Sequence, residues 1–373
     1  MRARRWRPGA GPSGHRDRLG RVGRGIVEVR PHGDAHFVAL RAAVSTLVPL
    51  VVLAVAGRLD LSMYAAFGAF TALYGRNHVH VPRLRMQLRL GGLLTLVVGA
   101  GVLVGVSPDR AWLAVPLAAL IASACTLLSE RQDWHPPGAL FPVFAFTACA
   151  SLESEPRDVA VALAVAAASA AFAVVVGNVG AFWRRRRVPR PERTERTERT
   201  ERTGPRPPVR RPVQVLRFPR NGIAVLLAGT LATGVGIGHP YWAMVSAVVP
   251  LVARDFGAQL VRGAQRVIGT FLGLAVTGVL LALEPSAWVV IALIVALQAG
   301  AELLIGRNYA LALTCVTPLA LLAVHLASGG SDPWVLVVDR GLETVIGVAI
   351  GLGVGFLARP SAREIARRRG LPG

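Results

Sequence analysis

The sequence contains no lysine, so its permanent positive charges are all carried by arginine. A Walker A phosphate-binding loop and a Schiff-base enzyme both require a lysine, and both are therefore excluded. Cysteine is also scarce, and Cys125, Cys149 and Cys315 each fall within an apolar segment. This placement indicates packing thiols rather than a disulfide framework or a metal site. No nucleophile and base stand out together, so we predict neither an enzyme nor a bound cofactor.

Charged residues are few for a chain of this length. They make up 17% of the 373 residues, whereas 53% are hydrophobic. This composition is typical of an α-helical protein that crosses a membrane many times. The formal net charge of +21 is spread as arginines over the tails and loops between apolar runs. Such a distribution sets membrane topology rather than forming one basic face, so nucleic acid is not a predicted partner.

Twelve apolar segments form two groups, separated by the charged stretch RRRRVPRPERTERTERTERTGPRPPVRRP. That stretch has four Glu-Arg-Thr units and little to bury, which predicts a flexible linker. We therefore predict an all-α polytopic membrane protein with about twelve transmembrane helices. The expected spans are 36–56, 61–74, 88–106, 111–128, 139–152, 157–182, 217–238, 240–253, 263–283, 287–304, 307–326 and 334–358.

Loop charges predict how these spans are oriented. Arginine-rich loops alternate with loops of little net positive charge, which places both termini in the cytoplasm of a plasma (inner) membrane. Tryptophans 112, 242, 288 and 334 begin spans on the outer side, as an interfacial aromatic belt would. The predicted parts are a disordered Arg-rich tail (1–35), a first six-span repeat (36–183), a cytoplasmic linker (184–214), a second repeat (215–358) and a basic tail (359–373).

An internal repeat supports two parallel six-helix halves. A gap-free shift of 177 residues places Tyr64 on Tyr241, Arg85 on Arg262, Arg89 on Arg266, Gly92 on Gly269 and Gly101 on Gly278. The segments 61–74 and 240–253 occupy matching places, and each covers only about two-thirds of a hydrocarbon core of roughly 30 Å. Paired short spans point to a transporter's binding site, unless each helix extends a turn into its polar flank.

Two sets of charged residues are candidates for function. Arg262 and Arg266, four apart at the expected cytoplasmic entrance of a span, either anchor in lipid phosphates or collect an anionic substrate. Asp339, Arg340 and Glu343 lie inside the last span, where carboxylates either couple to protons or form an internal ion pair. Glu302 is a third proton-coupling candidate and a predicted partner of Arg266. The predicted substrate-binding residues are Arg89, Arg266, Tyr64, Tyr241 and Trp242.

Glycines spaced one helical turn apart predict close helix packing. Gly269 and Gly273 form one such pair, and Gly347 and Gly351 form another. Small residues at this spacing let two helix backbones approach closely, so we assign them to packing rather than to chemistry.

The segment HPYWAMVSAVVPLVARDFGAQLVRGAQRVIGTFLG resembles a segment that recurs in fusaric acid resistance protein-like (FUSC) membrane proteins, which include aromatic acid exporters. RGLETVIGVAIG resembles the closing span of that family. The resemblance covers about 217–358 and is weaker over 36–182, where Gly92-Leu93 replaces the family's Gly-Thr pair. It implies proton-driven efflux of small amphipathic organic anions such as aromatic carboxylic acids.

An alternative function is a membrane scaffold whose Arg-rich segments bind anionic lipid or a cytosolic partner. About 1 kcal/mol per arginine near an anionic surface would be enough for adhesion. The predicted partners are thus membrane lipids and a small organic anion, and a homo-oligomer remains open.

Overall fold

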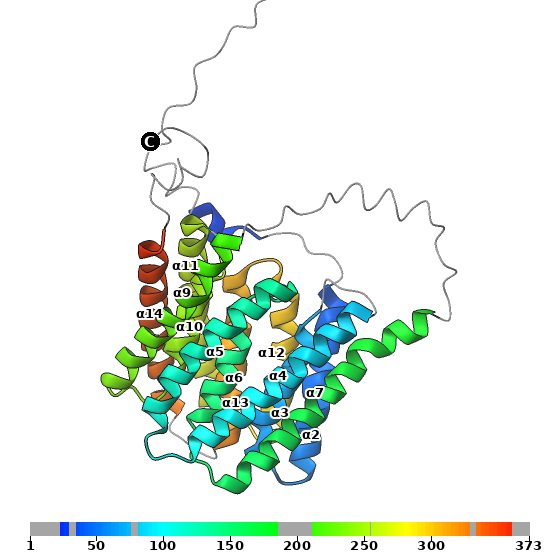
Figure 1. Ribbon diagram of the computed structural model, residues 1–373. Coiled ribbons are helices and arrows are strands. Elements are labelled where there is room, and N and C mark those ends of the chain that lie inside the picture. Colours follow the sequence, from blue (N-terminus) through cyan, green and yellow to red (C-terminus); the bar gives the residue numbers. More distant parts are fainter. Residues whose placement is uncertain are drawn as a thin grey trace, which may run out of the picture.

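The computed structural model describes residues 23–29, 35–75, 81–185, 211–253, 255–328 and 333–359, and all regular secondary structure in these ranges is helical (Figure 1). Each predicted span coincides with one helical segment. In chain order these are α2 (Ala35–Val55), η1 (Leu59–Leu61) with α3 (Ser62–Ala69) and η2 (Phe70–Leu73), α4 (Val81–Gly105), α5 (Arg110–Gln132), α6 (Leu140–Ala150), α7 (Pro156–Arg185), α9 (Arg211–Gly234), α10 (Tyr241–Leu251), α11 (Phe256–Ala282), α12 (Ala287–Ile305), α13 (Tyr309–Ser328) and α14 (Pro333–Leu357).

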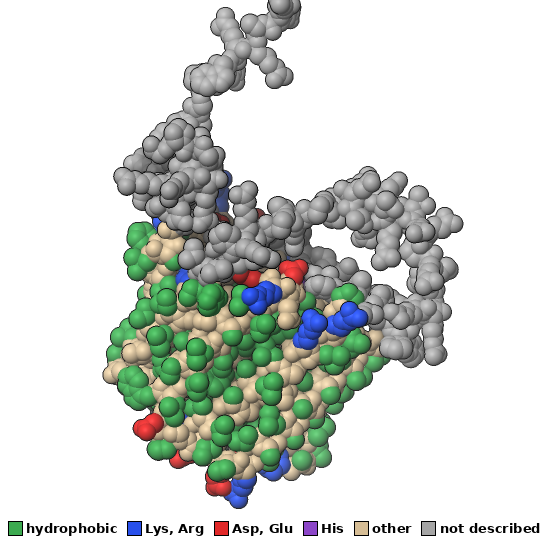
Figure 2. Space-filling view, viewed as in Figure 1, with side chains coloured by type: hydrophobic (Ala, Val, Ile, Leu, Met, Phe, Trp, Pro, Cys, Tyr) green, Lys and Arg blue, Asp and Glu red, His purple; other side chains and the backbone are tan. Residues whose placement is uncertain are grey.

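The surface is that of a membrane protein. Within the described ranges, seven helices are long and apolar enough to cross a bilayer, and three apolar segments are shorter. Large hydrophobic side chains such as Leu96, Leu120 and Val279 are 65–67% exposed. On the face shown in Figure 2, hydrophobic side chains spread over the body of the bundle, whereas charged ones gather toward its two ends. The chain is therefore a multi-pass membrane protein.

Corresponding helices of the two halves make corresponding contacts. Helix α3 packs against α7, as α10 packs against α14. Helix α4 packs against α6 and α7, as α11 packs against α13 and α14. Across the halves, α5 packs against α9, and α12 packs against α2. The order and the contacts of the six helices after Ala35 thus recur in the six helices after Arg211.

The residue register of the 177-residue shift does not extend to side-chain environments. Arg89 is exposed on α4, whereas Arg266 on α11 is only 3% exposed. Gly92 faces open space, whereas Gly269 lies against the backbone of Ala310. The cause is that α4 turns a different face inward, with Leu90 and its neighbours in the core. The predicted equivalence of Arg89 and Arg266 is therefore wrong in structural terms.

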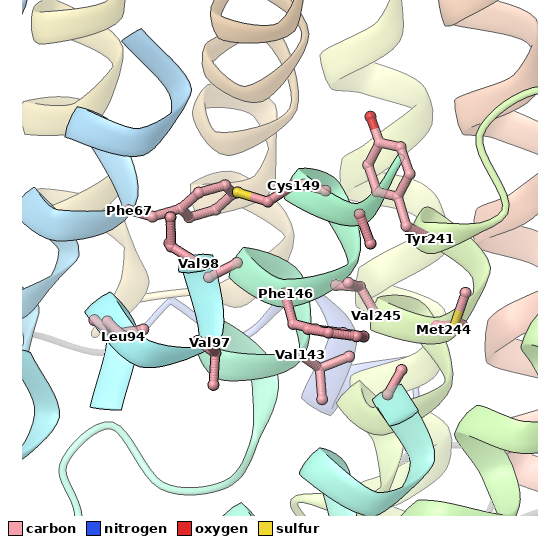
Figure 3. Close-up of a cluster of buried hydrophobic side chains, with 14 of the residues drawn as sticks. Phe67, Leu94, Val97, Val98, Val143, Phe146, Cys149, Tyr241, Met244 and Val245 are labelled. Carbon is pink, nitrogen blue, oxygen red and sulfur yellow. The ribbon is translucent and has the colours of Figure 1, made fainter. Parts of the chain in front are cut away.

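One apolar core joins the two halves (Figure 3). Figure 3 shows Leu94, Val97 and Val98 of α4 facing Phe146 of α6, with side chains of α10 on the other side of Phe146. The same cluster includes Trp242, which is 1% exposed. Because α10 belongs to the second half, this core holds both groups of helices together.

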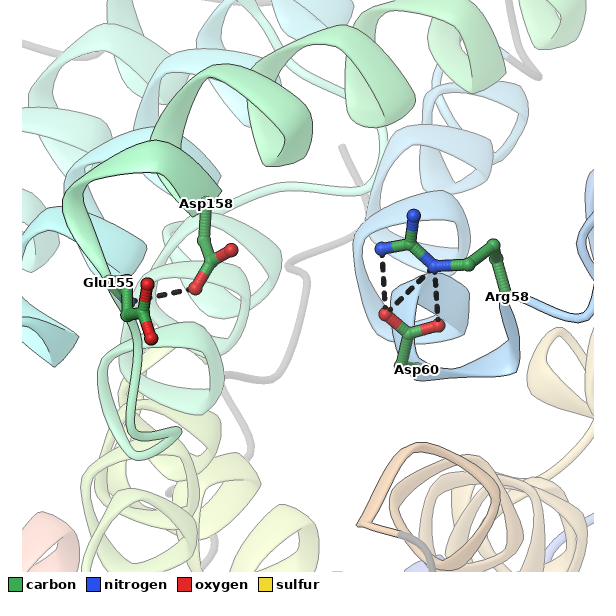
Figure 4. Close-up of polar contacts among 4 residues, drawn as sticks. All are labelled: Arg58, Asp60, Glu155 and Asp158. Carbon is green, nitrogen blue, oxygen red and sulfur yellow. Dashed lines mark hydrogen bonds and ion pairs between the residues drawn. The ribbon is translucent and has the colours of Figure 1, made fainter.

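The loops at one end of the bundle carry several ion pairs. Arg58 and Asp60 pair at 2.9 Å between α2 and α3 (Figure 4). At the start of α7, the Asp158 carboxylate accepts the Glu155 backbone N–H at 2.8 Å. Arg110 lies 3.8 Å from Glu153, which comes from a different loop. Exposed pairs of this kind contribute little stability. The Arg110–Glu153 pair joins two of the loops that the sequence places on the outer side.

The predicted disordered tail needs a correction over residues 23–29. The Gln265 side-chain amide donates to the backbone carbonyls of Gly25 and Ile26, both at 3.2 Å. The Asn308 amide donates to the carbonyls of Ile26 at 2.8 Å and Glu28 at 3.1 Å. Two buried amides thus hold this short segment against α11 and the start of α13. The rest of the predicted tail up to residue 34, most of the linker and nearly all of the basic tail lie outside the described residues.

Four glycines stand at close helix contacts. A Cβ on Gly347 would collide with the carbonyl oxygen of Ala243, and one on Gly351 with that of Ala247. In the other pair, a Cβ on Gly269 would collide with the carbonyl oxygen of Ala310, and one on Gly273 would lie 2.6 Å from Thr317 Cβ. Helices α10 and α14, and helices α11 and α13, therefore touch backbone to backbone.

Replacing Gly347 with Ala is expected to destabilise the protein by about 1–3 kcal/mol, because the added methyl must push two backbones apart. The matched control is Gly353→Ala on the same helix, where a Cβ meets nothing within 4 Å. Thermal unfolding in detergent should show a lowered midpoint for the first variant alone. Equal midpoints would contradict the tight α10–α14 contact.

Candidate functional site

Arg266 lies inside the bundle rather than at its surface. Helix α11 begins at Phe256, seven residues before the predicted span, because the Asp255 carboxylate caps it by accepting the Ala258 N–H at 2.9 Å. Arg266 is then ten residues into the helix, about 15 Å from its start. At 3% exposure its guanidinium does not reach lipid phosphates. The surface-anchor interpretation is therefore wrong for this residue.

The hydrogen bonds of Arg266 go to two hydroxyl groups. Its Nη1 donates to Tyr309 Oη on α13, and its Nη2 donates to Ser246 Oγ on α10, both at 3.3 Å. The predicted ion pair with Glu302 is absent from the contacts of Arg266 in the described structure. Glu302 lies on α12, which packs mainly against α13 and α2. Arg262 joins the same cluster, with its guanidinium carbon 4.2 Å from the centre of the Tyr309 ring.

A second buried cation and a carboxylate lie on α14. Arg340 is 1% exposed and Glu343 is 0% exposed. The guanidinium carbon of Arg340 lies 3.8 Å from the centre of the Trp242 ring. Arg340 Nε and Nη1 and both carboxylate oxygens of Glu343 have no hydrogen-bond partner within the described structure. The internal ion pair that the sequence offered as one interpretation is therefore not formed between these two residues.

Asp339 does have a partner, which the sequence reasoning missed. Nδ1 of His239 lies 2.9 Å from Asp339 Oδ2, with the two side chains 25% and 15% exposed. His239 is in the loop before α10, one hundred residues away along the chain. In the sequence, the only hint that His239 has a role is its position just before the Tyr241-Trp242 pair at the start of α10.

Trp242 joins the cluster to the first half. Its ring lies 4.8 Å, centre to centre, from Phe144 on α6, and 4.7 Å from the ring of Tyr241. The predicted aromatic belt is therefore wrong for Trp242, which is 1% exposed. The other predicted belt residues are more than half exposed: Trp112, Trp288 and Trp334.

The first half has no comparable charged cluster in the described residues. The 177-residue shift places Leu163 opposite Arg340 and Ala166 opposite Glu343. Tyr64 is buried in the apolar core, while Arg89 is exposed on α4. The structure thus brings Arg266, Tyr241 and Trp242 toward the Asp339–Glu343 segment, and it leaves Arg89 and Glu302 elsewhere.

The cluster has an excess of buried hydrogen-bond donors. Arg340 lies within electrostatic range of both Arg266 and Glu343. Arg266 Nε and the indole N–H of Trp242 also lack partners in the described structure. Buried polar groups are nearly always satisfied, so such donors indicate a place for water or for an anion. Among the described residues, no group of three His, Cys, Asp or Glu side chains is arranged to hold a metal.

Comparison with known families points to the same helices. Residues 224–354 match the family model described as fusaric acid resistance protein-like. This stretch, within the second half, is therefore similar to a fusaric acid resistance protein-like domain. The uncharacterized membrane protein YvaC of Bacillus subtilis (strain 168) is 31% identical over 138 residues, which are 37% of this chain and 22% of YvaC. The chain therefore covers about a fifth of that relative's length. No solved structure matches.

The stretch that matches the family model contains the whole charged cluster. Trp242, Arg266, Tyr309, Arg340 and Glu343 all fall between its first and last matched residues. Phe144, which contacts Trp242, lies outside the match. The cluster thus lies within the matched stretch, and one of its residues, Trp242, contacts the first half.

Proposed function

We propose that this protein is a secondary transporter of the plasma (inner) membrane that exports small amphipathic organic anions such as aromatic carboxylic acids, driven by protons. The observation that carries this proposal is the buried pair of cations, Arg266 and Arg340, with unpartnered N–H groups beside Trp242. The family match to a fusaric acid resistance protein-like domain agrees with a role in membrane transport.

The proposed architecture is two parallel six-helix halves, residues 36–183 and 215–358, with both termini in the cytoplasm. The recurring helix order and contacts support it, as do the charged loops that meet at one end. In this arrangement all twelve helical segments cross the membrane, including the short ones that contain α3 and α10. Parallel halves of this kind open a path by rocking against each other.

The proposed binding site uses complementary groups. A guanidinium binds a carboxylate through two charge-assisted hydrogen bonds. Arg340 and Arg266 both have N–H groups without a hydrogen-bond partner in the described structure. Trp242 and Tyr241 present rings for the apolar part of an aromatic acid. Glu343, with Asp339 one turn away, is the proposed proton carrier. Glu302 remains a separate proton-coupling candidate on α12.

One small cavity lies at the junction between the halves. A cavity of about 40 Å³ lies between α2, α3 and α6 of the first half and α12 and α13 of the second. That volume holds little more than one water molecule. A substrate therefore needs the two halves to move apart before it can pass. Trp242 contacts Phe144 of the first half, so this movement would change the surroundings of Trp242.

The proposal is tested by transport in membrane vesicles. Vesicles that contain the protein are loaded with a panel of aromatic acids, and efflux is followed with and without a protonophore. We expect efflux of at least one acid that stops when the proton gradient collapses. Efflux that persists would overturn proton coupling. Absence of any export, with loss of a membrane partner on deletion of the linker, would favour the scaffold.

Replacing Arg266 with Gln is expected to reduce export at least about tenfold, because a buried charge-assisted contact contributes about 1.5–3 kcal/mol. Membrane insertion should stay normal, since the side chain is buried and does not anchor the helix end. Arg89→Gln, at an exposed position on α4, is the matched control and should retain export. Equal loss in both variants would restore the predicted equivalence of the two arginines.

A further inference from the structure

His239 and Asp339 form a polar path from a loop to the interior. Nδ1 of His239 is 2.9 Å from Asp339 Oδ2, and the two side chains are 25% and 15% exposed. Glu343 follows Asp339 by four residues, so both carboxylates lie on one face of α14. Glu343 is 0% exposed. Accessibility therefore falls step by step from His239 through Asp339 to Glu343.

The backbone around His239 is shaped for this contact. A Cβ on Gly238 would lie 2.8 Å from Asp339 Oδ2, so only glycine lets the loop approach the carboxylate this closely without displacing it. The ring of Tyr241, the first residue of α10, packs edge-on to the imidazole with 5.9 Å between centres. The imidazole thus contacts both an aromatic ring and the carboxylate.

Four other ionisable groups in the described structure bear on this path. Tyr241 lies beside His239, and Arg340 follows Asp339 directly on α14. Arg266, on α11, and Tyr309, on α13, act electrostatically on Arg340. Arg340 acts in turn on Glu343, as does Asp339. A structural ion pair alone would not require a second, unpartnered carboxylate one turn deeper.

We propose that His239 and Asp339 pass protons between the outer solution and Glu343, an inference that rests on the proposed function. A proton from water binds His239 Nε2, and the imidazolium gives its Nδ1 proton to the Asp339 carboxylate. Asp339 then passes that proton to the Glu343 carboxylate, directly or through one water, and returns to its ionised form. Each transfer moves one proton and needs no other reactant. Histidine suits the outermost step because its ring can accept a proton at one nitrogen while it donates one from the other.

The test separates proton-coupled export from simple exchange. Reconstituted vesicles are assayed for export driven by an imposed pH gradient, and for exchange of labelled against unlabelled aromatic acid at equal pH. Exchange needs the anion site but no net proton movement. For His239→Gln we expect gradient-driven export to fall about tenfold or more, because a positioned proton carrier typically contributes at least that much. The exchange rate of His239→Gln should stay within about twofold of the rate of the unchanged protein.

Each other outcome is decisive. Unchanged gradient-driven export in His239→Gln would overturn the path. Equal loss of export and exchange would also overturn it, because it would mean that the pair only holds α10 against α14. No exchange by the unchanged protein would instead sink the proposed function itself. Asp339→Asn should behave like His239→Gln, and His36→Gln, at an exposed position on α2, should leave both activities unchanged.

Discussion

Replacing Arg340 with Met is expected to weaken substrate binding and slow exchange strongly without destabilising the fold. The guanidinium of Arg340 is 1% exposed, and two of its nitrogens have no partner in the described structure. Its loss removes charge-assisted hydrogen bonds to the substrate carboxylate, which we expect to weaken binding at least about 100-fold, or about 3 kcal/mol. Methionine keeps most of the packing against Trp242 while removing the charge.

The stability of the same variant separates a binding role from a structural one. Breaking a buried ion pair by removal of one partner destabilises a protein by about 3–5 kcal/mol. Arg340 makes no such pair with Glu343, so the thermal midpoint of Arg340→Met should stay unchanged or rise. Binding is measured by equilibrium titration of a labelled aromatic acid in detergent. Unchanged affinity together with a lowered midpoint would show that Arg340 is only a packing residue.

Arg340→Lys is the conservative comparison. Lysine keeps the charge but loses the planar group that binds a carboxylate with two hydrogen bonds and stacks on an indole. We therefore expect intermediate affinity, with export partly retained. Recovery to the level of the unchanged protein would mean that only the charge matters at this position.

The helical segments were predictable because each one is determined by the residues of its own stretch of sequence. Apolar runs bounded by charged or glycine-rich loops indicate helices wherever they fall, and each of the twelve expected spans coincides with one helical segment. The buried charges of α14 were also predictable, because a carboxylate within an apolar run is visible without knowing its partners. The close packing of Gly347, on α14, against α10 was predictable in the same way, from small residues spaced one helical turn apart.

The surroundings of those charges were not predictable, because they come from other helices. Arg266 was expected at the membrane surface, since its helix was expected to begin at residue 263, but the Asp255 cap starts it earlier. Trp242 was expected in an aromatic belt, yet α10 is surrounded by other helices and buries it. His239 pairs with a residue one hundred positions away, and no local pattern encodes that contact.

Replacing Glu343 with Gln is expected to remove the dependence of export on the proton gradient. Glutamine has nearly the same shape but cannot take up a proton, while Arg266 and Arg340 remain available to the anion. Gradient-driven export should therefore fall at least about 100-fold, within the range that a proton carrier contributes. Exchange at equal pH should persist and should no longer vary with pH. The assay is the pair of vesicle measurements with an imposed gradient and with labelled substrate.

Two comparisons decide what the loss means. Glu302→Gln removes the other buried carboxylate that the sequence singles out, but on α12, which packs mainly against α13 and α2. If it leaves gradient-driven export intact, the proton acts at the Arg340–Glu343 cluster. If instead Glu302→Gln uncouples export and Glu343→Gln does not, the proton path runs through α12. Both the role of Glu343 and the path through His239 would then be lost, while anion binding by the two arginines would stand.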